Sequence, residues 1–276
     1  MSWKQDVLEL VQTSPANVTL LLADADSGKE LLSFNRYRRF VSASTIKTAI
    51  LLCALEAVQK GELDLDAPVF VPQEEILSDS AVFERGEQEM PLRDLLRWMI
   101  IVSDNTATNA LIRLLTMERI NDFCARMGWK DSKVERLMLD FDAVKAGKNN
   151  YTSALDQFGM FRAIYQKSIL TPELCDLAMD MLLGQRDCGD FLRYIPGPVR
   201  VAHKTGGLDF LENDSGLFFL GKATLYLGVF VTDDMRFIEE TARAARLDRV
   251  QLHGDQSMTC ANRLSRTLGA ERLIRV

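Results

Sequence analysis

The feature that most constrains the fold is that strand patterns occur at both ends of the chain, while helical patterns fill the middle. Near the start, "NVTLLLAD" and "ELLSFN" flank the turn sequence "ADSGK", which predicts a β-hairpin. After residue 198, "VRVAHKTGG", "SGLFFL" and "ATLYLGVFVTD" predict three more strands. Strands from the two ends can therefore pair in one antiparallel sheet.

The predicted helices fall between and beside these strands. Residues 3–13 carry apolar side chains at helical spacing, and "TIKTAILLCALEAVQKG" predicts a buried helix that ends at Gly61. "PLRDLLRWMIIVSDN", "NTATNALIRLLTMERINDFCARMGW" and "TPELCDLAMDMLLG" continue the helical series. "FIEETARAARL" and "SMTCANRLSRTLG" predict two more helices near the end, after a tight turn at Gly221-Lys222.

This order predicts an α+β fold in which a terminal antiparallel sheet is flanked by helices, beside a helical lobe. We expect a single domain over residues 1–276, with no repeat or linker that divides it. Its α/β lobe comprises residues 1–40 and 190–276, and its all-α lobe comprises residues 41–189. An active site is expected in a cleft between the lobes.

The charge balance excludes several classes of partner. The net charge is −6 and the pI is about 5.2, whereas nucleic acids and anionic membranes select basic surfaces. The longest apolar run is too short to span a bilayer. We therefore expect a small-molecule substrate, with no nucleic-acid or membrane partner and no cofactor; the oligomeric state stays open.

Cysteine and histidine usage argues against a metal site. The histidines are His203 and His253, and no cysteine pair has metal-ligand spacing, so we expect no metal. A Ser-His-Asp triad would need one of these histidines, and neither has a recognisable partner motif. A disulfide framework is not expected from the odd number of cysteines, which are Cys53, Cys124, Cys175, Cys188 and Cys260.

The first residues do not resemble an export signal. Asp6, Glu9 and Gln12 interrupt any apolar stretch, and no basic region precedes one. We expect a cytoplasmic location for the chain as written, and an extracytoplasmic one if a leader has been removed.

The first chemical motif is Ser44-Thr45-Ile46-Lys47, at the start of the apolar helix. Residues three apart share a helix face, so the Lys47 amine can reach the Ser44 hydroxyl. A serine hydroxyl needs a neighbouring base to attack a carbonyl, and a buried lysine can supply one when it is neutral. Taken alone, the same residues could be a helix cap and a surface lysine.

Two further motifs follow in order. Ser103-Asp104-Asn105 lies after an apolar helix and could alone be an ordinary turn. Lys204-Thr205-Gly206 ends a predicted strand and is followed by Gly207. The set is far more specific than any member, because the three motifs are those of the penicillin-recognising serine enzymes.

From about residue 18 to residue 232, the chain resembles the class A β-lactamases and related β-lactamase-like serine hydrolases. The likeness includes "SDNTATNALI" and the order of strands and helices. It implies the β-lactamase/transpeptidase-like α+β fold. It also implies acylation of Ser44, with Lys47 as base, Ser103 as proton carrier and Lys204 as the nearby cation.

The residue types also suit substrate recognition. The Asn105 amide can bind the amide side chain of a substrate, and Lys204 and Thr205 suit a substrate carboxylate. Gly206 and Gly207 allow close approach of a ligand to the strand. The resemblance further implies an oxyanion hole from the N–H groups of Ser44 and Gly207, and a structural role for Asp104.

One part of the family pattern is missing. Class A β-lactamases use a loop glutamate to activate the water that hydrolyses the acyl-enzyme, and the matching loop here is residues 136–156. No glutamate lies between Glu135 and Glu173. Asp140 and Asp142 are the nearest carboxylates, and Asp140 is our candidate for this role, although both could equally be solvated loop acids or a helix cap. Asn149 or Asn150 could instead position a water.

Three functions remain open at this point. The first is a serine acyl-enzyme hydrolase of the β-lactamase class that opens β-lactams or related amides and esters. The second is a D-alanyl-D-alanine carboxypeptidase or esterase of the same superfamily, which needs no loop glutamate. The third is a sensor or binding module that acylates once and does not turn over.

Overall fold

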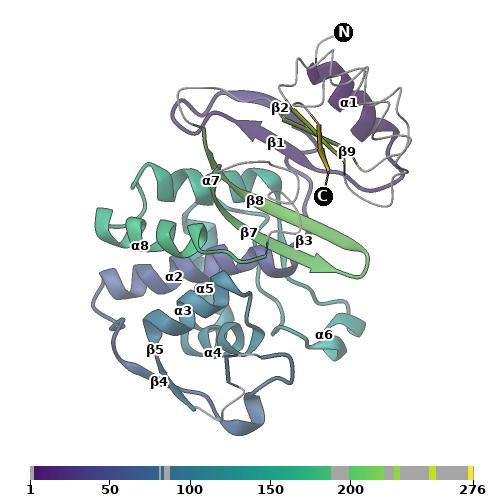
Figure 1. Cartoon of the computed structure of the whole chain (residues 1–276). Helices are drawn as coiled ribbons and strands as arrows, with labels where there is room; N and C mark the ends of the chain where they lie inside the picture. Colours follow the sequence, from purple (N-terminus) through teal and green to yellow (C-terminus); the bar gives the residue numbers. More distant parts are fainter. Residues whose placement is uncertain are drawn as a thin grey trace. The chain divides into compact units, whose positions relative to one another are not determined.

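Helix α2 (Lys47–Gln59) runs through the middle of the helical part of the computed structural model (Figure 1). Every residue from Lys47 to Ala57 is buried, because this segment is apolar on nearly all sides. Helices α3, α4, α5 and α8 pack against it. The core is therefore built around the helix that begins just after Ser44.

The structure describes residues 3–80, 82–83, 88–187, 199–220, 227–230, 249–252 and 273–275. The chain separates into two compact units. One unit comprises residues 1–18, 188–201 and 218–276, and the other comprises residues 19–187 and 202–217. All the candidate site residues lie in the second unit. The lobe boundaries expected from the sequence stay a prediction.

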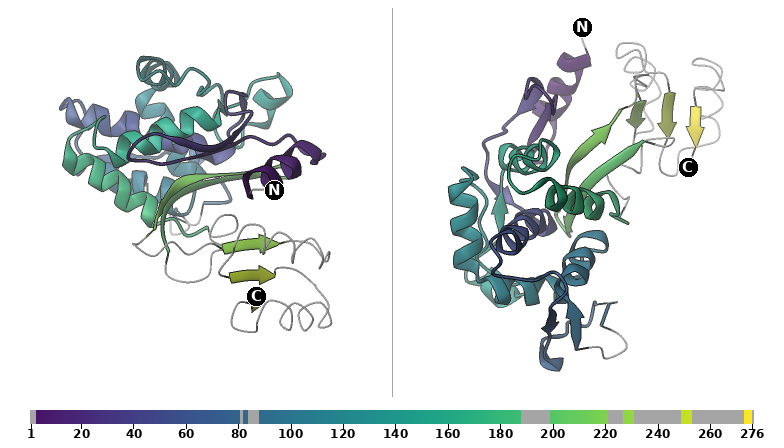
Figure 2. Two further views of the ribbon diagram at one scale, coloured as in Figure 1. Left: turned by 90° about the horizontal axis from the view of Figure 1, so that it is seen from above. Right: turned by 90° about the vertical axis from the view of Figure 1, so that its left-hand side faces the viewer.

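The remaining helices, seen from two more sides in Figure 2, are α1 (Trp3–Thr13), η1 (Ala43–Ile46), η2 (Gln73–Glu75), α3 (Leu92–Ile101), α4 (Asn105–Leu115), α5 (Met117–Arg126), α6 (Phe141–Lys145), α7 (Ala154–Tyr165) and α8 (Pro172–Leu183). The predicted run from residue 105 to residue 129 is interrupted at Thr116, whose φ is 67° and whose side chain caps α5. Helices α2, α3 and α8 confirm the sequence pattern, whereas η2, α6 and α7 were not predicted.

The strands pair in small groups. Antiparallel pairs join β1 (Leu20–Ala23) to β2 (Glu30–Phe34), β3 (Phe40–Val41) to β6 (Tyr151–Thr152), and β4 (Pro68–Phe70) to β5 (Glu89–Pro91). β7 (Arg200–Leu208) pairs with β8 (Leu211–Phe219), and β10 (Arg249–Leu252) lies between β9 (Leu227–Phe230) and β11 (Leu273–Arg275). The hairpin predicted over residues 17–35 is confirmed by the pairing of β1 with β2.

The strand direction near the end of the chain differs from the expected antiparallel pairing, although the α+β fold class is confirmed. β10 is parallel to both β9 and β11. Parallel neighbours need long crossover connections, and residues 231–248 and 253–272 separate these strands. The turn at Gly221-Lys222 and the two predicted terminal helices lie outside the described residues.

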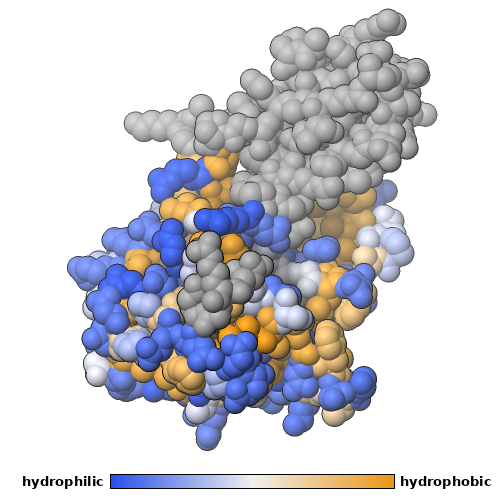
Figure 3. All heavy atoms as spheres, turned by 60° about the horizontal axis from the view of Figure 1, so that its bottom comes forward, coloured by the Kyte–Doolittle hydropathy of each residue, from blue (hydrophilic) through white to orange (hydrophobic). Residues whose placement is uncertain are grey.

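The face seen in Figure 3 mixes hydrophilic and hydrophobic residues over the coloured part of the surface. Large exposed apolar side chains, such as Phe70 and Phe141, come from separate segments. Within the part of the chain that the structure describes, each helix is too short or too polar to cross a bilayer.

Candidate active site

Ser44 lies in a tight turn that leads directly into α2. The turn, η1, follows strand β3, and Ala43 before the serine has a φ of 45°, in the left-handed region that non-glycine residues rarely adopt. The backbone N–H of Ser42 donates to the carbonyl of Asn150 at 2.9 Å. The pairing of β3 with β6 and this hydrogen bond fix the approach of the chain to the helix start.

Lys47 is completely buried, and its amine is held by the Ser-Asp-Asn loop. Nζ donates to the carbonyl of Ser103 at 2.7 Å, to Ser103 Oγ at 3.0 Å and to Asn105 Oδ1 at 2.9 Å. The structure therefore brings together two of the three motifs. A neutral Lys47 has a free lone pair, so the Ser103 hydroxyl can reverse and donate to it.

Burial also prepares Lys47 to act as a base. Desolvation lowers the pKa of Lys47 well below its ordinary value, and the positive charge of Lys204 lowers it further. Asp104 and Asp79 oppose both effects. The direction is the one that the sequence required for a neutral lysine beside Ser44.

Ser103 lies in the loop between α3 and α4, where its backbone is strained and the next residue caps α4. Ser103 has a φ of 58°. The next residue, Asp104, is buried and caps α4: Oδ1 accepts from the N–H of Ala107 at 2.7 Å, and Oδ2 accepts from Ser80 Oγ at 2.6 Å. These contacts support the structural role that was expected of Asp104.

Both polar atoms of the Asn105 side-chain amide form hydrogen bonds within the chain. Oδ1 accepts from Lys47, and Nδ2 donates to Asp79 Oδ2 at 2.8 Å. Asp79 was not predicted as a site residue, because it belongs to no motif. Any substrate contact of Asn105 must share or replace these hydrogen bonds.

Strand β7 brings the third motif to the start of α2, and Gly206 is the point of contact. A β-carbon at Gly206 would lie 2.8 Å from the backbone nitrogens of both Ser44 and Thr45. Such a distance is shorter than real carbon–nitrogen contacts allow, so only glycine fits. Gly206 thus permits the strand to approach the helix start itself, a tighter constraint than the ligand approach predicted from the sequence.

Replacing Gly206 with alanine is expected to push β7 away from Ser44. Because the neighbouring atoms are backbone, they cannot rotate aside, and we expect a loss of about 1–3 kcal/mol in the free energy of unfolding. Urea unfolding of Gly206→Ala measures this loss. The matched control is Gly147→Ala, where nothing lies within 4 Å of the added β-carbon and only the φ of 80° opposes the substitution. A smaller loss at Gly206 than at Gly147 would contradict the close approach.

Lys204 is as deeply buried as Lys47. Its Nζ donates to the carbonyl of Thr205 at 2.9 Å. Desolvation lowers the pKa of Lys204 to about 8, while Asp187 and Asp214 work in the opposite direction. Two buried amines that repel each other therefore share the site, as the sequence predicted.

The lowered pKa of Lys204 predicts how stability depends on pH. Between pH 8 and the ordinary lysine pKa of about 10.4, the unfolded chain holds a proton that the folded chain has released, so the free energy of unfolding rises with pH. The expected contribution of Lys204 is about 3 kcal/mol across this range. Lys204→Met loses this contribution and keeps only the rise that Lys47 causes, because the pKa of Lys47 is lowered as well. Urea unfolding of both proteins at pH 7.5 and pH 10.5 tests this. Equal pH dependence in the two proteins would contradict a buried, uncharged Lys204.

Two other residues of β7, Thr205 and Gly207, lie next to acidic side chains of this chain. The Thr205 hydroxyl donates to Asp187 Oδ2 at 2.9 Å, so the chain itself already binds the group predicted to contact a substrate carboxylate. A β-carbon at Gly207 would lie 3.0 Å from the side chain of Glu212. The oxyanion role of the Ser44 and Gly207 N–H groups stays a prediction.

The loop carboxylate predicted to activate water acts locally in the structure. Asp140 Oδ1 accepts from the N–H of Ala143 at 2.9 Å and so caps α6. Asn149 accepts from the Arg136 guanidinium, and Asn150 binds backbone groups of Glu135 and Arg136. The described contacts join none of these side chains to the amine of Lys47.

We therefore predict that Asp140→Asn keeps the cap and changes neither acylation nor the decay of an acyl adduct. Asp140→Ala is expected to lower the free energy of unfolding by about 1 kcal/mol, because the cap is lost. Chemical unfolding and intact mass spectrometry measure the two effects. Decay of the adduct that slows more than tenfold in Asp140→Asn would restore its catalytic role.

A buried pair formed by His203 and Asp214 was not predicted from the sequence. His203 Nδ1 lies 3.0 Å from Asp214 Oδ2, and both side chains are almost completely buried. His203 Nε2 is buried without a hydrogen-bond partner. Since the two residues lie on neighbouring strands, β7 and β8, the signal would have been the register of that hairpin.

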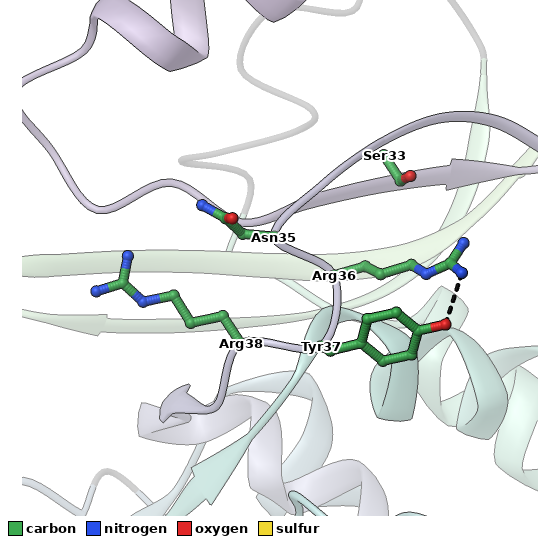
Figure 4. A pocket seen from close by; sticks show the side chains of 5 residues that line it. All are labelled: Ser33, Asn35, Arg36, Tyr37 and Arg38. Atoms are coloured by element: carbon green, nitrogen blue, oxygen red, sulfur yellow. Dashed lines mark hydrogen bonds between the residues drawn. The ribbon is translucent and has the colours of Figure 1, made fainter.

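Other features of the described residues do not add a site. No group of three or more His, Cys, Asp or Glu side chains in these ranges is arranged to hold a metal ion. A surface hollow is lined by Ser33, Asn35, Arg36, Tyr37 and Arg38 (Figure 4). Arg36 there already pairs with Glu30 and donates to the Tyr37 hydroxyl, and its guanidinium extends away from that of Arg38.

Proteins with similar sequences include beta-lactamases and a D-alanyl-D-alanine carboxypeptidase. The model of the beta-lactamase enzyme family matches residues 2–268. Extended-spectrum beta-lactamase PER-1 of Pseudomonas aeruginosa is 26% identical over 247 residues, which cover 83% of this chain and 79% of that enzyme. The D-alanyl-D-alanine carboxypeptidase DacF of Bacillus subtilis is 24% identical over 172 residues, which cover 62% of this chain and 42% of DacF.

Solved structures agree on the fold. An ancestral class A β-lactamase superposes with a TM-score of 0.73 at 22% identity, covering 81% of this chain and 87% of that one. PBP-A superposes with a TM-score of 0.72 at 24% identity, covering 79% and 82%. Since the family model spans nearly all of the sequence, the chain belongs to the class A beta-lactamase family of serine enzymes.

Proposed function

We propose that this protein is a serine acyl-enzyme hydrolase that opens β-lactams, or related amides and esters, through Ser44. The observation that carries the proposal is the buried Lys47 amine, which is hydrogen-bonded to Ser103 and lies three residues from Ser44 on the same helix start. The family membership and the likeness to PER-1 support it.

Acylation follows from this arrangement. Neutral Lys47 takes the proton of the Ser44 hydroxyl, and Ser44 Oγ bonds to the carbonyl carbon. When the carbon–nitrogen bond breaks, the leaving nitrogen takes a proton from the Ser103 hydroxyl, and Lys47 returns its proton to Ser103. Water then hydrolyses the ester and restores Ser44.

The second candidate is a D-alanyl-D-alanine carboxypeptidase or esterase with the same acylation step. The observation that favours it is the local capping role of Asp140 in a loop without a glutamate. The likeness to DacF points the same way. A third candidate is a non-turnover sensor, which differs only in the fate of the acyl group.

One set of rates separates the three candidates. The purified protein is assayed with nitrocefin, with a peptide ending in D-Ala-D-Ala, and by intact mass at intervals after mixing with benzylpenicillin. The leading proposal predicts faster hydrolysis of nitrocefin than of the peptide and an adduct that decays within seconds to minutes. Faster peptide hydrolysis favours the carboxypeptidase, and an adduct that is stable for hours favours the sensor.

A further inference from the structure

The Thr205 hydroxyl, which is predicted to bind a substrate carboxylate, already donates a hydrogen bond to a carboxylate of this chain. Thr205 Oγ1 donates to Asp187 Oδ2 at 2.9 Å, and Lys204 Nζ donates to the Thr205 carbonyl. Thr205 is 3% exposed and Lys204 is fully buried, whereas Asp187 is exposed. An incoming carboxylate thus meets Asp187 before it meets either donor.

Asp187 is held in this place by several contacts. The buried Gln185 accepts the N–H groups of Arg186 at 2.9 Å and of Asp187 at 3.0 Å through its Oε1. Gln185 Nε2 donates to the carbonyl of Ile100 at 2.9 Å, and the N–H of Arg186 donates to the carbonyl of Ile101 at 2.8 Å. The end of α3 therefore anchors the segment after α8.

The charges make the contact selective. Asp187 and Asp214 are both charge partners of Lys204, so carboxylates of this chain already lie near the lysine that would attract a substrate carboxylate. A substrate carboxylate at Thr205 would lie beside the like charge of Asp187, which disfavours binding. A neutral or cationic group at the same place meets no such repulsion.

We propose that Asp187 is a specificity-determining residue that selects against acyl donors with a free carboxylate and favours neutral ones, such as esters or esterified lactams. This inference rests on the proposed acylation of Ser44. It narrows the substrate class of that site.

The test compares two probes that differ only in this charge. The second-order rate of acylation is measured by intact mass with benzylpenicillin and with its methyl ester, for the unaltered protein, Asp187→Asn and Asp187→Ala. Asn keeps an acceptor for Thr205 but removes the charge, and Ala frees the hydroxyl. We expect the ratio of acid to ester rates to rise about tenfold or more in both variants.

Asp180→Asn is the matched control, because it removes an exposed charge from α8 without touching Thr205. Its ratio is expected to equal that of the unaltered protein. A ratio that is unchanged or falls in the Asp187 variants overturns the inference, since Asp187 would then only hold Thr205 in place. If neither probe labels Ser44 in any of the proteins, the proposed function fails and the inference fails with it.

Discussion

Ser44→Ala is expected to lower the rate of acylation by about 10⁴-fold or more, because it removes the oxygen atom that attacks the carbonyl carbon. Ser44 lies where the turn η1 enters α2, and strand β7 approaches its backbone nitrogen at Gly206. The substitution removes one oxygen atom and leaves the backbone unchanged. Intact mass after mixing with benzylpenicillin measures the adduct directly.

Ser42→Ala is the matched control for this experiment. The Ser42 hydroxyl is buried and donates to the Ala43 carbonyl at 3.2 Å. The substitution therefore removes a buried serine hydroxyl close to Ser44 without removing the proposed nucleophile. We expect Ser42→Ala to acylate at a rate within a few-fold of the unaltered protein. Equal labelling of Ser44→Ala and Ser42→Ala would show that the reacting group lies elsewhere.

The second large effect is expected at Lys47. Lys47→Met keeps an apolar chain of similar length in the buried position but removes the base, so acylation is expected to slow by about 10²–10⁴-fold. Lys47→Arg is expected to be equally slow, because a guanidinium stays protonated and cannot accept the Ser44 proton. Stopped-flow acylation rates measure both variants.

Lys145→Met controls for the loss of a lysine charge, since Lys145 is exposed and pairs with Asp142. Thermal unfolding checks that Lys47→Met stays folded. If folded Lys47→Arg acylates as fast as the unaltered protein, Lys47 acts as a fixed cation and not as the base.

Much of the fold could be predicted from periodicity. The hairpin of β1 and β2 and the buried helix α2 have strong local patterns, and Gly61 ends the latter with a φ of 72°. The break at Thr116 carried no comparable signal. The parallel direction of β10 depends on connections that no local pattern specifies.

In the candidate site too, residues that belong to sequence motifs could be predicted, and residues placed by tertiary structure could not. Lys47, Ser103 and Lys204 belong to motifs whose residue types state their chemistry, and the first two are in direct contact. Asp187 and Asp214 could not be found, because each reaches its partner through tertiary packing or strand register and belongs to no motif.

Asp140 shows the opposite case. A carboxylate in the expected loop suggested water activation, but its side chain caps a short helix. Aspartate is common at both kinds of position, so residue type alone did not decide between them.

The most direct test of the Ser44 site is to map the residue that an acylating probe modifies. The unaltered protein is mixed with benzylpenicillin at pH 7, quenched at intervals, digested and analysed by peptide mass spectrometry. We predict a single adduct on the peptide that contains Ser44. An adduct on a different residue, or no adduct with any β-lactam or ester probe, would contradict it.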